Sequence, residues 1–554
     1  MRKIILKERE NDEKYLDKIN DLPEEDLDSK LERLPDFDED ELQENLQKEL
    51  QEQLQTEINL DKDITEKIIE DTQDIKKPVK RKRPEEKENK KIRNKEFARI
   101  TYLFIGLFLV LMGYLVYFNI FQSKTIINSP YNKRQDIFAD RVVRGEILDK
   151  DGNVLAKTEV EGDGTEKRIY PYGDLFSHVV GYADKGKSGI ESVENYNLLT
   201  SNAFIIEKVI KEFKGEKNIG DNVVTTLDMG LQQATYDALG DNKGAVVIME
   251  ASTGKILSLV SKPTFDPNYV AVNWQSLNED LDSAMLNRAM QGKYAPGSTF
   301  KIVTALEYMR ENPDYPSYYY ECTGQIEHDG TVIHCNKNKV HGPEDLKSSF
   351  ANSCNSSFAN IGLRLDIDEY RKTAKQLLFN SKLPSPLMYS ESKFQLTKKD
   401  PASEIMMTAM GQGKTQVSPY HMALITSAVA NGGQLMKPYL VDQIVNYTGT
   451  TVTKNMPEKY ADLMTNEEAA QLTEYMKEVV NNGTASSLRG RNYTIAGKTG
   501  TAEYSTDKDK AHSWFVGFTD VDNPDLVISA VIEGADNTGA RAVNVVKKIC
   551  DSYY

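Results

Sequence analysis

The segment Gly244–Pro263 reads GAVVIMEASTGKILSLVSKP, two apolar, β-rich runs on either side of a short turn at Ala251–Gly254. This pattern predicts a β-hairpin. Three more strand-like runs lie close together near the other end of the chain: YTIAGKTGTAEY (493–504), HSWFVGFTD (512–520) and DLVISAVIEG (525–534). Helical patterns and loops occupy the interval. We therefore expect one antiparallel sheet, closed by strands from both ends of the domain and covered by helices.

The composition of the chain excludes several classes of protein. Its 554 residues carry a formal net charge of −16, whereas a nucleic-acid-binding protein needs a basic face to displace the counterions of phosphates. Four cysteines are too few for a disulfide-stapled scaffold. The six histidines are dispersed, which argues against a histidine-rich metal protein.

A single uncharged stretch, Ile100–Phe121, has the length of a membrane span. As a helix it would extend about 33 Å, and the hydrocarbon core of a bilayer is roughly 30 Å thick. The basic run Lys76–Arg99 lies immediately before it, and Lys and Arg stay on the cytoplasmic side. We expect a single-pass type II protein of the cytoplasmic membrane with its catalytic domain outside.

The segments on either side of this span differ in character. RGEILDKDGNVLAKT (144–158) predicts two short strands around a Lys-Asp-Gly turn, within a small α+β module that suits a pedestal. The predicted organisation is an acidic, largely disordered or partly helical cytoplasmic tail with its basic run (1–99), a transmembrane signal-anchor helix (100–121), an extracytoplasmic pedestal (122–225) and a catalytic domain (226–554).

Three short motifs carry chemistry: S-x-x-K at Ser298–Lys301, S-x-N at Ser353–Asn355 and K-T-G at Lys498–Gly500. Each motif alone is weak evidence, and S-x-x-K occurs elsewhere in the chain. Context distinguishes Ser298, which follows Ala-Pro-Gly and precedes the apolar helical run FKIVTALEYM. Residues three apart share one face of a helix, so the amine of Lys301 can approach the hydroxyl of Ser298.

These residue types make a coherent acyl-transfer site. The hydroxyl of Ser298 becomes a nucleophile when a base takes its proton, and Lys301 can be that base when burial or a neighbouring cation such as Lys498 keeps it neutral. Ser353 can relay the proton to a leaving amine, and Asn355 can hold a substrate amide. Backbone N–H groups, one of them at Ser298, can stabilise an oxyanion.

The motif set and its order resemble the serine β-lactamases and penicillin-binding proteins. Cys354 stands where the motif of that family often has Asp, which weakens the β-lactamase interpretation. Over about residues 130–554 the chain is most similar to a class B penicillin-binding protein. Further similar motifs are Arg144–Asp149, Leu286–Ala289, Gly411–Gly413 and Ser418–Pro419. The resemblance implies an α/β (α+β) penicilloyl-serine-transferase or serine β-lactamase-like fold, with helices on both faces of an antiparallel sheet.

The resemblance also implies a function. Ser298 would attack the D-Ala-D-Ala amide of a peptidoglycan stem peptide, release D-Ala and pass the acyl group to the amine of a second strand. Thr499, Gly500 and Thr501 would bind the substrate carboxylate with help from Lys498, and the N–H of Thr501 would complete the oxyanion hole. No cofactor or metal is implied. The expected partners are stem peptides, β-lactams, the cytoplasmic membrane, a SEDS-family glycosyltransferase and other cell-wall machinery, but no nucleic acid.

Two other functions remain open at this point. A D,D-carboxypeptidase, an endopeptidase or a β-lactamase would use the same acyl-enzyme but resolve it with water. A catalytically silent sensor would bind β-lactams and signal through its tail. The N-terminal module and the tail favour the transpeptidase over a hydrolase, and the tail has no recognisable protease or kinase motif that would favour a sensor.

The cysteines allow several interpretations. Cys322 and Cys335 flank a Gly-containing turn that is expected outside the membrane, where the compartment can be oxidising, so the sequence leaves a disulfide between them undecided. The spacing of Cys335 with His334 and His341 matches no standard zinc finger, and no metal site is predicted. Cys354 is predicted to be a small buried residue beside the site.

Overall fold

The computed structural model describes residues 84–118, 141–503, 511–535, 539 and 541–554. Residues 1–83, which hold most of the predicted acidic tail, lie outside the described residues. The last three residues of the predicted span also lie outside them.

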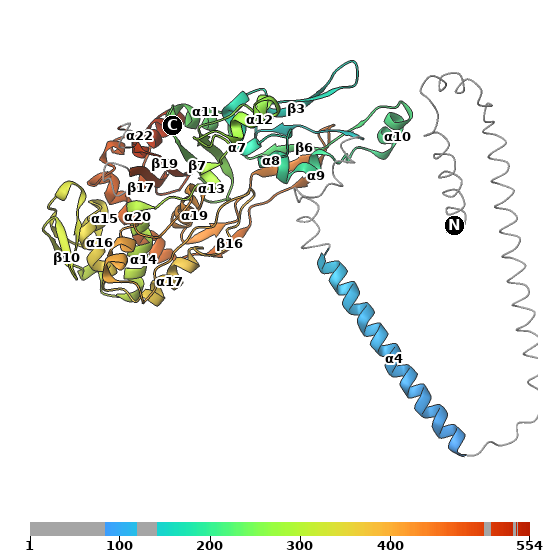
Figure 1. Cartoon of the computed structure of the whole chain (residues 1–554), viewed down its shortest axis with the longest axis horizontal. Coiled ribbons are helices and arrows are strands. Elements are labelled where there is room, and N and C mark those ends of the chain that lie inside the picture. Colours follow the sequence, from blue (N-terminus) through green and yellow to red (C-terminus); the bar gives the residue numbers. More distant parts are fainter. Residues whose placement is uncertain (1–83, 119–140, 504–510, 536–538, 540) are drawn as a thin grey trace, which may run out of the picture. The chain divides into compact units, whose positions relative to one another are not determined.

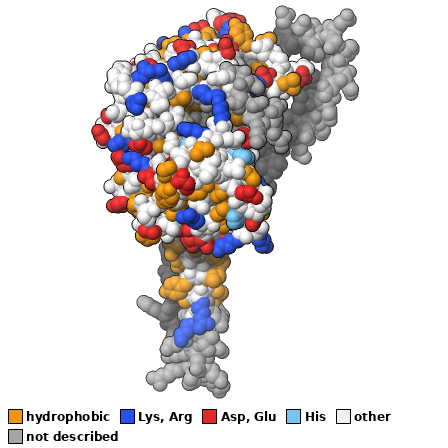
Figure 2. Space-filling model, turned by 90° about the vertical axis from the view of Figure 1, so that its left-hand side faces the viewer, with side chains coloured by type: hydrophobic (Ala, Val, Ile, Leu, Met, Phe, Trp, Pro, Cys, Tyr) orange, Lys and Arg blue, Asp and Glu red, His pale blue; other side chains and the backbone are white. Residues whose placement is uncertain are grey.

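The apolar stretch forms a helix. Helix α4 extends over Pro84–Tyr117, and its part Phe97–Tyr117 is, in the described portion of the chain, the one helix long and apolar enough to cross a membrane. Hydrophobic side chains cover this helix, and basic side chains gather toward one end (Figure 2). In the described part of the chain the apolar side chains of this helix are exposed, whereas a core helix of a soluble protein buries such side chains.

A five-stranded antiparallel sheet forms the centre of the catalytic region, in the order β17-β18-β19-β7-β8 (Figure 1). Its strands are β7 (Gly244–Glu250), β8 (Ile256–Lys262), β17 (Ile495–Glu503), β18 (Ala511–Thr519) and β19 (Leu526–Ile532). The N-terminal hairpin β7–β8 thus pairs directly with the C-terminal strand β19, with Ile528 opposite Ile248. The predicted sheet, closed by both ends of the domain, is confirmed.

Helices cover both faces of this sheet (Figure 1). One face packs against α11 (Met229–Leu239) and α22 (Ala542–Tyr553), and the other packs against α13 (Arg288–Gln291), α19 (Pro419–Ala430) and α20 (Asn466–Asn481). The 12 residues of α19 are apolar or small on nearly every side, which suits a helix buried between the sheet and a further helical layer.

The further layer carries most of the site. Its helices are α14 (Lys301–Glu311), α15 (Leu346–Ala351), α16 (Asn355–Gly362), α17 (Ile367–Gln376) and α18 (Ala402–Ala409). Short strands accompany them: β9 (Tyr320–Cys322), β10 (Gln325–His328), β11 (Thr331–His334) and β12 (Gly342–Glu344). Strand β9 pairs with β12, and β10 pairs with β11, both antiparallel.

A second, six-stranded sheet builds the pedestal, in the order β15-β14-β6-β2-β3-β4. Its strands are β2 (Ile147–Leu148), β3 (Val154–Val160), β4 (Glu166–Ile169), β6 (Asn222–Thr225), β14 (Val441–Val445) and β15 (Thr451–Lys454). The two strands predicted around the Lys-Asp-Gly turn are β2 and β3. Strands β14 and β15 come from the catalytic part of the sequence, which therefore returns to the pedestal to complete its sheet.

Smaller elements complete the chain. The pedestal also contains β1 (Val142–Val143) paired with β5 (Asn218–Ile219), and helices α7 (Ser177–Val180), α8 (Gly189–Val193), α9 (Asn195–Leu198) and α10 (Ile205–Phe213). The catalytic region adds α12 (Val270–Asn278) and the antiparallel pair β13 (Gln434–Met436) and β16 (Lys459–Asp462).

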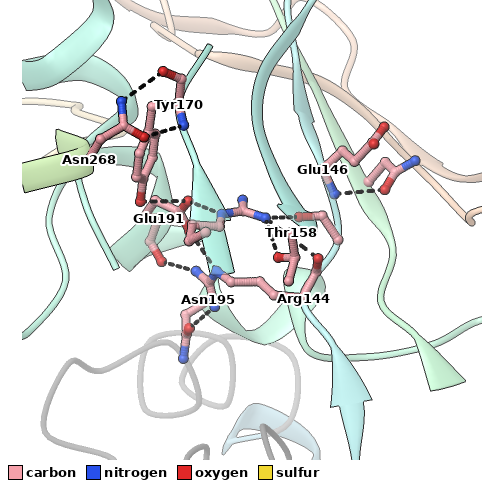
Figure 3. A network of polar contacts seen from close by, with 10 residues as sticks. Arg144, Glu146, Thr158, Tyr170, Glu191, Asn195 and Asn268 are labelled. Carbon is pink, nitrogen blue, oxygen red and sulfur yellow. Dashed lines mark hydrogen bonds and ion pairs between the residues drawn. The ribbon is translucent and has the colours of Figure 1, made fainter. Parts of the chain in front are cut away.

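A buried ion network holds the pedestal together (Figure 3). Glu191 accepts from Arg144 Nε at 2.6 Å and from Arg168 Nε at 2.7 Å, and both of its oxygens are fully enclosed. Burial opposes ionisation of Glu191, but the two guanidinium groups outweigh it and hold the pKa of the carboxyl below its ordinary value. The network reaches the catalytic region because Asn268 exchanges hydrogen bonds with the backbone of Tyr170.

Candidate active site

Ser298 lies in the 3-10 turn Gly297–Phe300 (η5), which continues directly into α14. Gly297 has a φ of +55°, and a Cβ there would stand 2.4 Å from the carbonyl oxygen of Thr501. Only glycine both adopts this backbone and allows the approach. The turn that presents Ser298 is therefore pressed against strand β17.

The K-T-G glycine completes this contact from the other side. A Cβ at Gly500 would lie 3.1 Å from Thr299 Cγ2 and 3.0 Å from Trp514 Cβ. The indole of Trp514 also donates to the carbonyl of Ala295, at 3.1 Å. The S-x-x-K and K-T-G motifs, some 200 positions apart, thus meet through small groups and a fixed aromatic ring.

Lys301 is fully buried, and its amine faces the S-x-N motif. Its Nζ donates to the carbonyl oxygen of Ser353 at 2.8 Å, to Asn355 Oδ1 at 2.9 Å and to Ser353 Oγ at 3.3 Å. Among the described residues, no hydrogen bond joins this amine to Ser298 Oγ. Burial lowers the pKa of Lys301 to about 8, which makes the neutral amine accessible near physiological pH.

Ser353 occupies a sharp turn between α15 and α16. Its φ of +55° is unusual for a residue with a side chain, and costs of order 1–3 kcal/mol that the surroundings must offset. The turn is held by Cys354, whose N–H donates to the Ser349 carbonyl at 2.9 Å and whose sulfur accepts from the N–H of Ser357 as the cap of α16. Asn355 donates to the carbonyl of His334 at 3.1 Å.

Lys498 is the second buried lysine of the site. Its Nζ donates to the carbonyl of Thr499 at 3.0 Å and lies 5.6 Å from the centre of the Phe350 ring. Burial, reinforced by the charge of Lys301, places the pKa of Lys498 well below its ordinary value. Lys301 and Lys498 are thus two buried amines of one site, and both resist protonation. A proton that reaches either of them is readily passed on to another group.

Strand β17 lies at the edge of the central sheet, next to β18 alone in the strand order. Thr499 is half-buried and Thr501 is exposed on this strand. Thr484, from the segment after α20, shares a hydrogen bond of 2.5 Å with the hydroxyl of Thr499. An extended peptide can add to such an edge, and the two threonines then lie where its terminal group would arrive.

The structure brings the three motifs together, joins the Gly411–Gly413 motif of the sequence analysis to them, and adds Thr484, which the sequence analysis did not single out. Gln412 donates to the carbonyl of Thr501 at 3.4 Å, and Gly411 accepts from the N–H of Gly297 at 2.8 Å. Thr484 orients Thr499. No local pattern marks Thr484, because its role arises only when the segment after α20 lies beside β17.

Cys322 and Cys335 are free thiols whose sulfurs are 3.7 Å apart, and all four cysteines of the chain are buried and free. Cys354 is fully buried beside the site, as predicted.

A serine at the start of a helix, a buried lysine three residues later and an open strand edge define a serine acyltransferase. Comparison with known proteins agrees with this class. Residues 244–551 match the penicillin binding protein transpeptidase domain, and residues 144–223 match the penicillin binding protein A dimerisation domain.

Named relatives have the same architecture. The peptidoglycan D,D-transpeptidase PbpA of Mycobacterium tuberculosis is 30% identical over 483 residues, which cover 81% of this chain and 95% of that protein. The ceftriaxone acyl-enzyme of penicillin-binding protein A from M. tuberculosis superposes with a TM-score of 0.69 at 27% identity, covering 76% and 99% of the two chains. A D,D-transpeptidase domain from Eggerthella lenta gives 0.67 at 30% identity, covering 74% and 98%.

The chain belongs to the penicillin-binding protein transpeptidases. Its dimerisation domain ahead of the transpeptidase domain places it in class B, as the sequence motifs predicted.

Proposed function

We propose that the chain is a membrane-anchored peptidoglycan D,D-transpeptidase in which Ser298 is the nucleophile and Lys301 its base. The observation that carries the assignment of the base is the fully buried amine of Lys301, which has a pKa of about 8 and lies one turn after Ser298. A lysine with its ordinary pKa near 10.4 would hold its proton at neutral pH.

In the acylation step, Ser298 Oγ attacks the carbonyl carbon of the penultimate D-Ala while neutral Lys301 accepts the hydroxyl proton. The carbonyl oxygen takes the electron pair, and the backbone N–H groups of Ser298 and Thr501 stabilise it. Collapse breaks the amide bond. The proton passes from Lys301 through the hydroxyl of Ser353, 3.3 Å away, to the leaving amine of D-Ala.

In the second step, the amine of a neighbouring stem peptide attacks the ester on Ser298. Its proton returns through the same groups to Ser298 Oγ, and the new amide is the cross-link. Asn355 holds the amide of the donor peptide. Thr499, Gly500 and Thr501 line the place of the terminal carboxylate, with the amine of Lys498 nearby as a further hydrogen-bond donor. A β-lactam presents its lactam carbonyl to Ser298 in place of the D-Ala-D-Ala amide, and the opened ring remains on the serine as a slowly released ester.

The proposed arrangement in the cell is type II. Basic residues precede the apolar part of α4, and such residues stay in the cytoplasm, so residues 122–554 would face outward toward peptidoglycan. The proposed domains remain 122–225 for the pedestal and 226–554 for the catalytic domain. Because the region before Gly244 matches a dimerisation domain, we expect glycan polymerisation to come from a partner, a SEDS-family glycosyltransferase.

The test uses the full-length chain in detergent with a fluorescent penicillin, followed by peptide mass spectrometry. We expect a stable adduct on Ser298 that is absent in Ser298→Ala. An adduct on another residue would overturn the assignment of the nucleophile. With a stem-peptide substrate, cross-linked dimer supports the transpeptidase, whereas D-Ala released without any cross-link, or rapid opening of the lactam, would indicate a hydrolase.

A further inference from the structure

A cluster of sulfur and nitrogen atoms lies directly behind the S-x-N motif. Cys322 ends strand β9, Cys335 follows β11, His341 precedes β12 and Cys354 caps α16. Their ligand atoms all lie within 4.8 Å of one another, and in the described part of the chain this is the one group of its kind. The three cysteines are buried, and the histidine is half-buried.

The distances within the cluster match the edges of a metal tetrahedron. With Zn–S near 2.3 Å and Zn–N near 2.0 Å, tetrahedral ligands stand about 3.8 Å apart for two sulfurs and about 3.5 Å apart for sulfur and nitrogen. The Sγ atoms of Cys322 and Cys335 are 3.7 Å apart, as are those of Cys335 and Cys354, and Cys322 Sγ lies 3.3 Å from His341 Nδ1.

The chemistry of the donors selects the metal. Three thiolates and one imidazole form a soft, nitrogen-containing set that suits zinc, and a closed four-ligand site is structural rather than catalytic. A disulfide between Cys322 and Cys335 would need their sulfurs at about 2.05 Å, whereas they stand at the edge length of the tetrahedron.

A further polar group supports the cluster. The hydroxyl of Ser356 lies 3.2 to 3.3 Å from each of the three sulfurs and can donate to one of them. Hydrogen-bond donors around thiolates are the usual outer partners of a metal site. Three buried thiols around one hydroxyl would otherwise satisfy one another poorly, because S–H is a weak donor.

We propose that Cys322, Cys335, His341 and Cys354 bind one structural Zn²⁺ ion, which fixes the S-x-N turn of the active site. Binding releases the thiol protons to solvent and ties the β9–β12 strands to the start of α16. Cys354 stands between Ser353 and Asn355, so its coordination holds in place the left-handed turn that presents both residues to Lys301. The metal acts on position and takes no part in the acyl transfer.

The metal itself is tested first, with a readout that does not depend on activity. Full-length protein purified without chelator is expected to contain about one zinc per chain. After removal of the metal, added Co²⁺ should give thiolate-to-cobalt charge-transfer absorption and the intense visible bands of a tetrahedral site. Cys335→Ser should weaken metal binding by more than about 100-fold. That is a larger effect than the loss of a residue that only hydrogen-bonds to a metal ligand.

A matched control separates this site from a general effect of thiols. Cys550 is also buried and free but lies in α22, away from the cluster. Cys550→Ser should therefore keep the metal and the cobalt spectrum. Absence of stoichiometric zinc together with an octahedral cobalt spectrum, or a Cys322–Cys335 disulfide found by mass spectrometry, would overturn the proposal.

The positioning role has its own test. Removal of zinc should slow penicillin acylation of the wild type at least tenfold, and zinc should restore the rate. Cys354→Asp keeps an oxygen ligand and should retain the metal and the acylation rate, whereas Cys354→Ala should lose the metal and be acylated at least tenfold more slowly. Unchanged acylation after removal of the metal would overturn the positioning role. Ser298→Ala should bind zinc normally without being acylated, so failure of the metal site and failure of the proposed nucleophile remain distinguishable.

Discussion

The amine of Lys301 donates to Asn355 Oδ1 at 2.9 Å, so the S-x-x-K and S-x-N motifs are joined by a hydrogen bond inside the protein. The proposed base is thereby held by the residue proposed to hold the substrate amide. A substrate that engages Asn355 competes with Lys301 for its oxygen, which would free the amine to turn toward Ser298. The proposed mechanism therefore predicts that substrate binding and activation of Ser298 are coupled.

Replacement of the base should separate chemistry from folding. Lys301→Met keeps the length of the side chain and removes the amine, so acylation by penicillin should fall by about 10²–10⁴-fold. The free energy of unfolding should change by no more than about 2 kcal/mol, because the lost hydrogen bonds and the removed buried amine have opposite effects. Stopped-flow labelling and chemical denaturation measure the two. Near-normal labelling of this variant would exclude Lys301 as the base.

The pH dependence follows from the pKa of Lys301. The neutral amine is the active form, so the acylation rate should rise about tenfold per pH unit below about 8 and level off above it. Burial favours the neutral form in the folded state, so the stability contribution of this lysine increases as the pH rises from about 8 toward 10.5. The range from pH 6 to pH 9 includes the pKa of Lys301, about 8. An acylation rate that stays constant over this range would contradict the assignment of Lys301 as the base. In Lys301→Met, the acylation rate should no longer rise with pH.

The glycine before the nucleophile can be tested against a matched glycine. Gly297 and Gly490 have φ values of +55° and +73°, but a Cβ at Gly490 meets nothing within 4 Å. Gly490→Ala should cost about 1–2 kcal/mol from the left-handed backbone alone and leave acylation unchanged. Gly297→Ala should cost more and slow acylation about 100-fold, because it pushes Ser298 away from Thr501. Equal effects of the two variants would show that the contact with β17 is unimportant.

The buried network of the pedestal predicts a large loss of stability. Glu191→Gln leaves Arg144 and Arg168 buried without a counter-ion and should cost about 3–5 kcal/mol, measured by chemical denaturation. Glu369→Gln removes the exposed partner of Lys372 and should cost less than about 1 kcal/mol.

The same network gives a pH effect. Because the pKa of Glu191 is lowered in the folded state, its stabilising contribution is present above 4.5 and is lost as the pH falls through the folded value. A Glu191→Gln variant as stable as the wild type would mean that the network adds nothing.

Much of this molecule follows from local patterns. The apolar, β-rich runs of the hairpin β7–β8 and of the strands β17 to β19 identify them as strands in the sequence. Pro296-Gly297 marks the start of the turn that carries Ser298. The 3-10 geometry of that turn is not visible in the sequence, because the S-x-x-K spacing fits both kinds of helix.

Other features depend on long-range assembly. The cysteine and histidine cluster escaped prediction because its members are separated by 13, 6 and 13 positions and lie in or next to four different elements, so no short motif connects them. The left-handed backbone of Ser353 is equally hidden, because serine carries no propensity for it. The return of β14 to the pedestal is decided by pairing with β6, not by any property of Val441–Val445 alone.

That pairing has a consequence for how such proteins can be inherited and rearranged. With Val223 opposite Ile444, strand β6 of the N-terminal module shares its backbone hydrogen bonds with β14, a strand that follows α19 and the short strand β13 in the chain. A gene fragment beginning at Gly244 would encode a β14 with an unpaired edge, and such edges invite aggregation. We therefore expect exchange of the two modules between lineages to succeed only when β14 and β15 stay matched to the pedestal they complete.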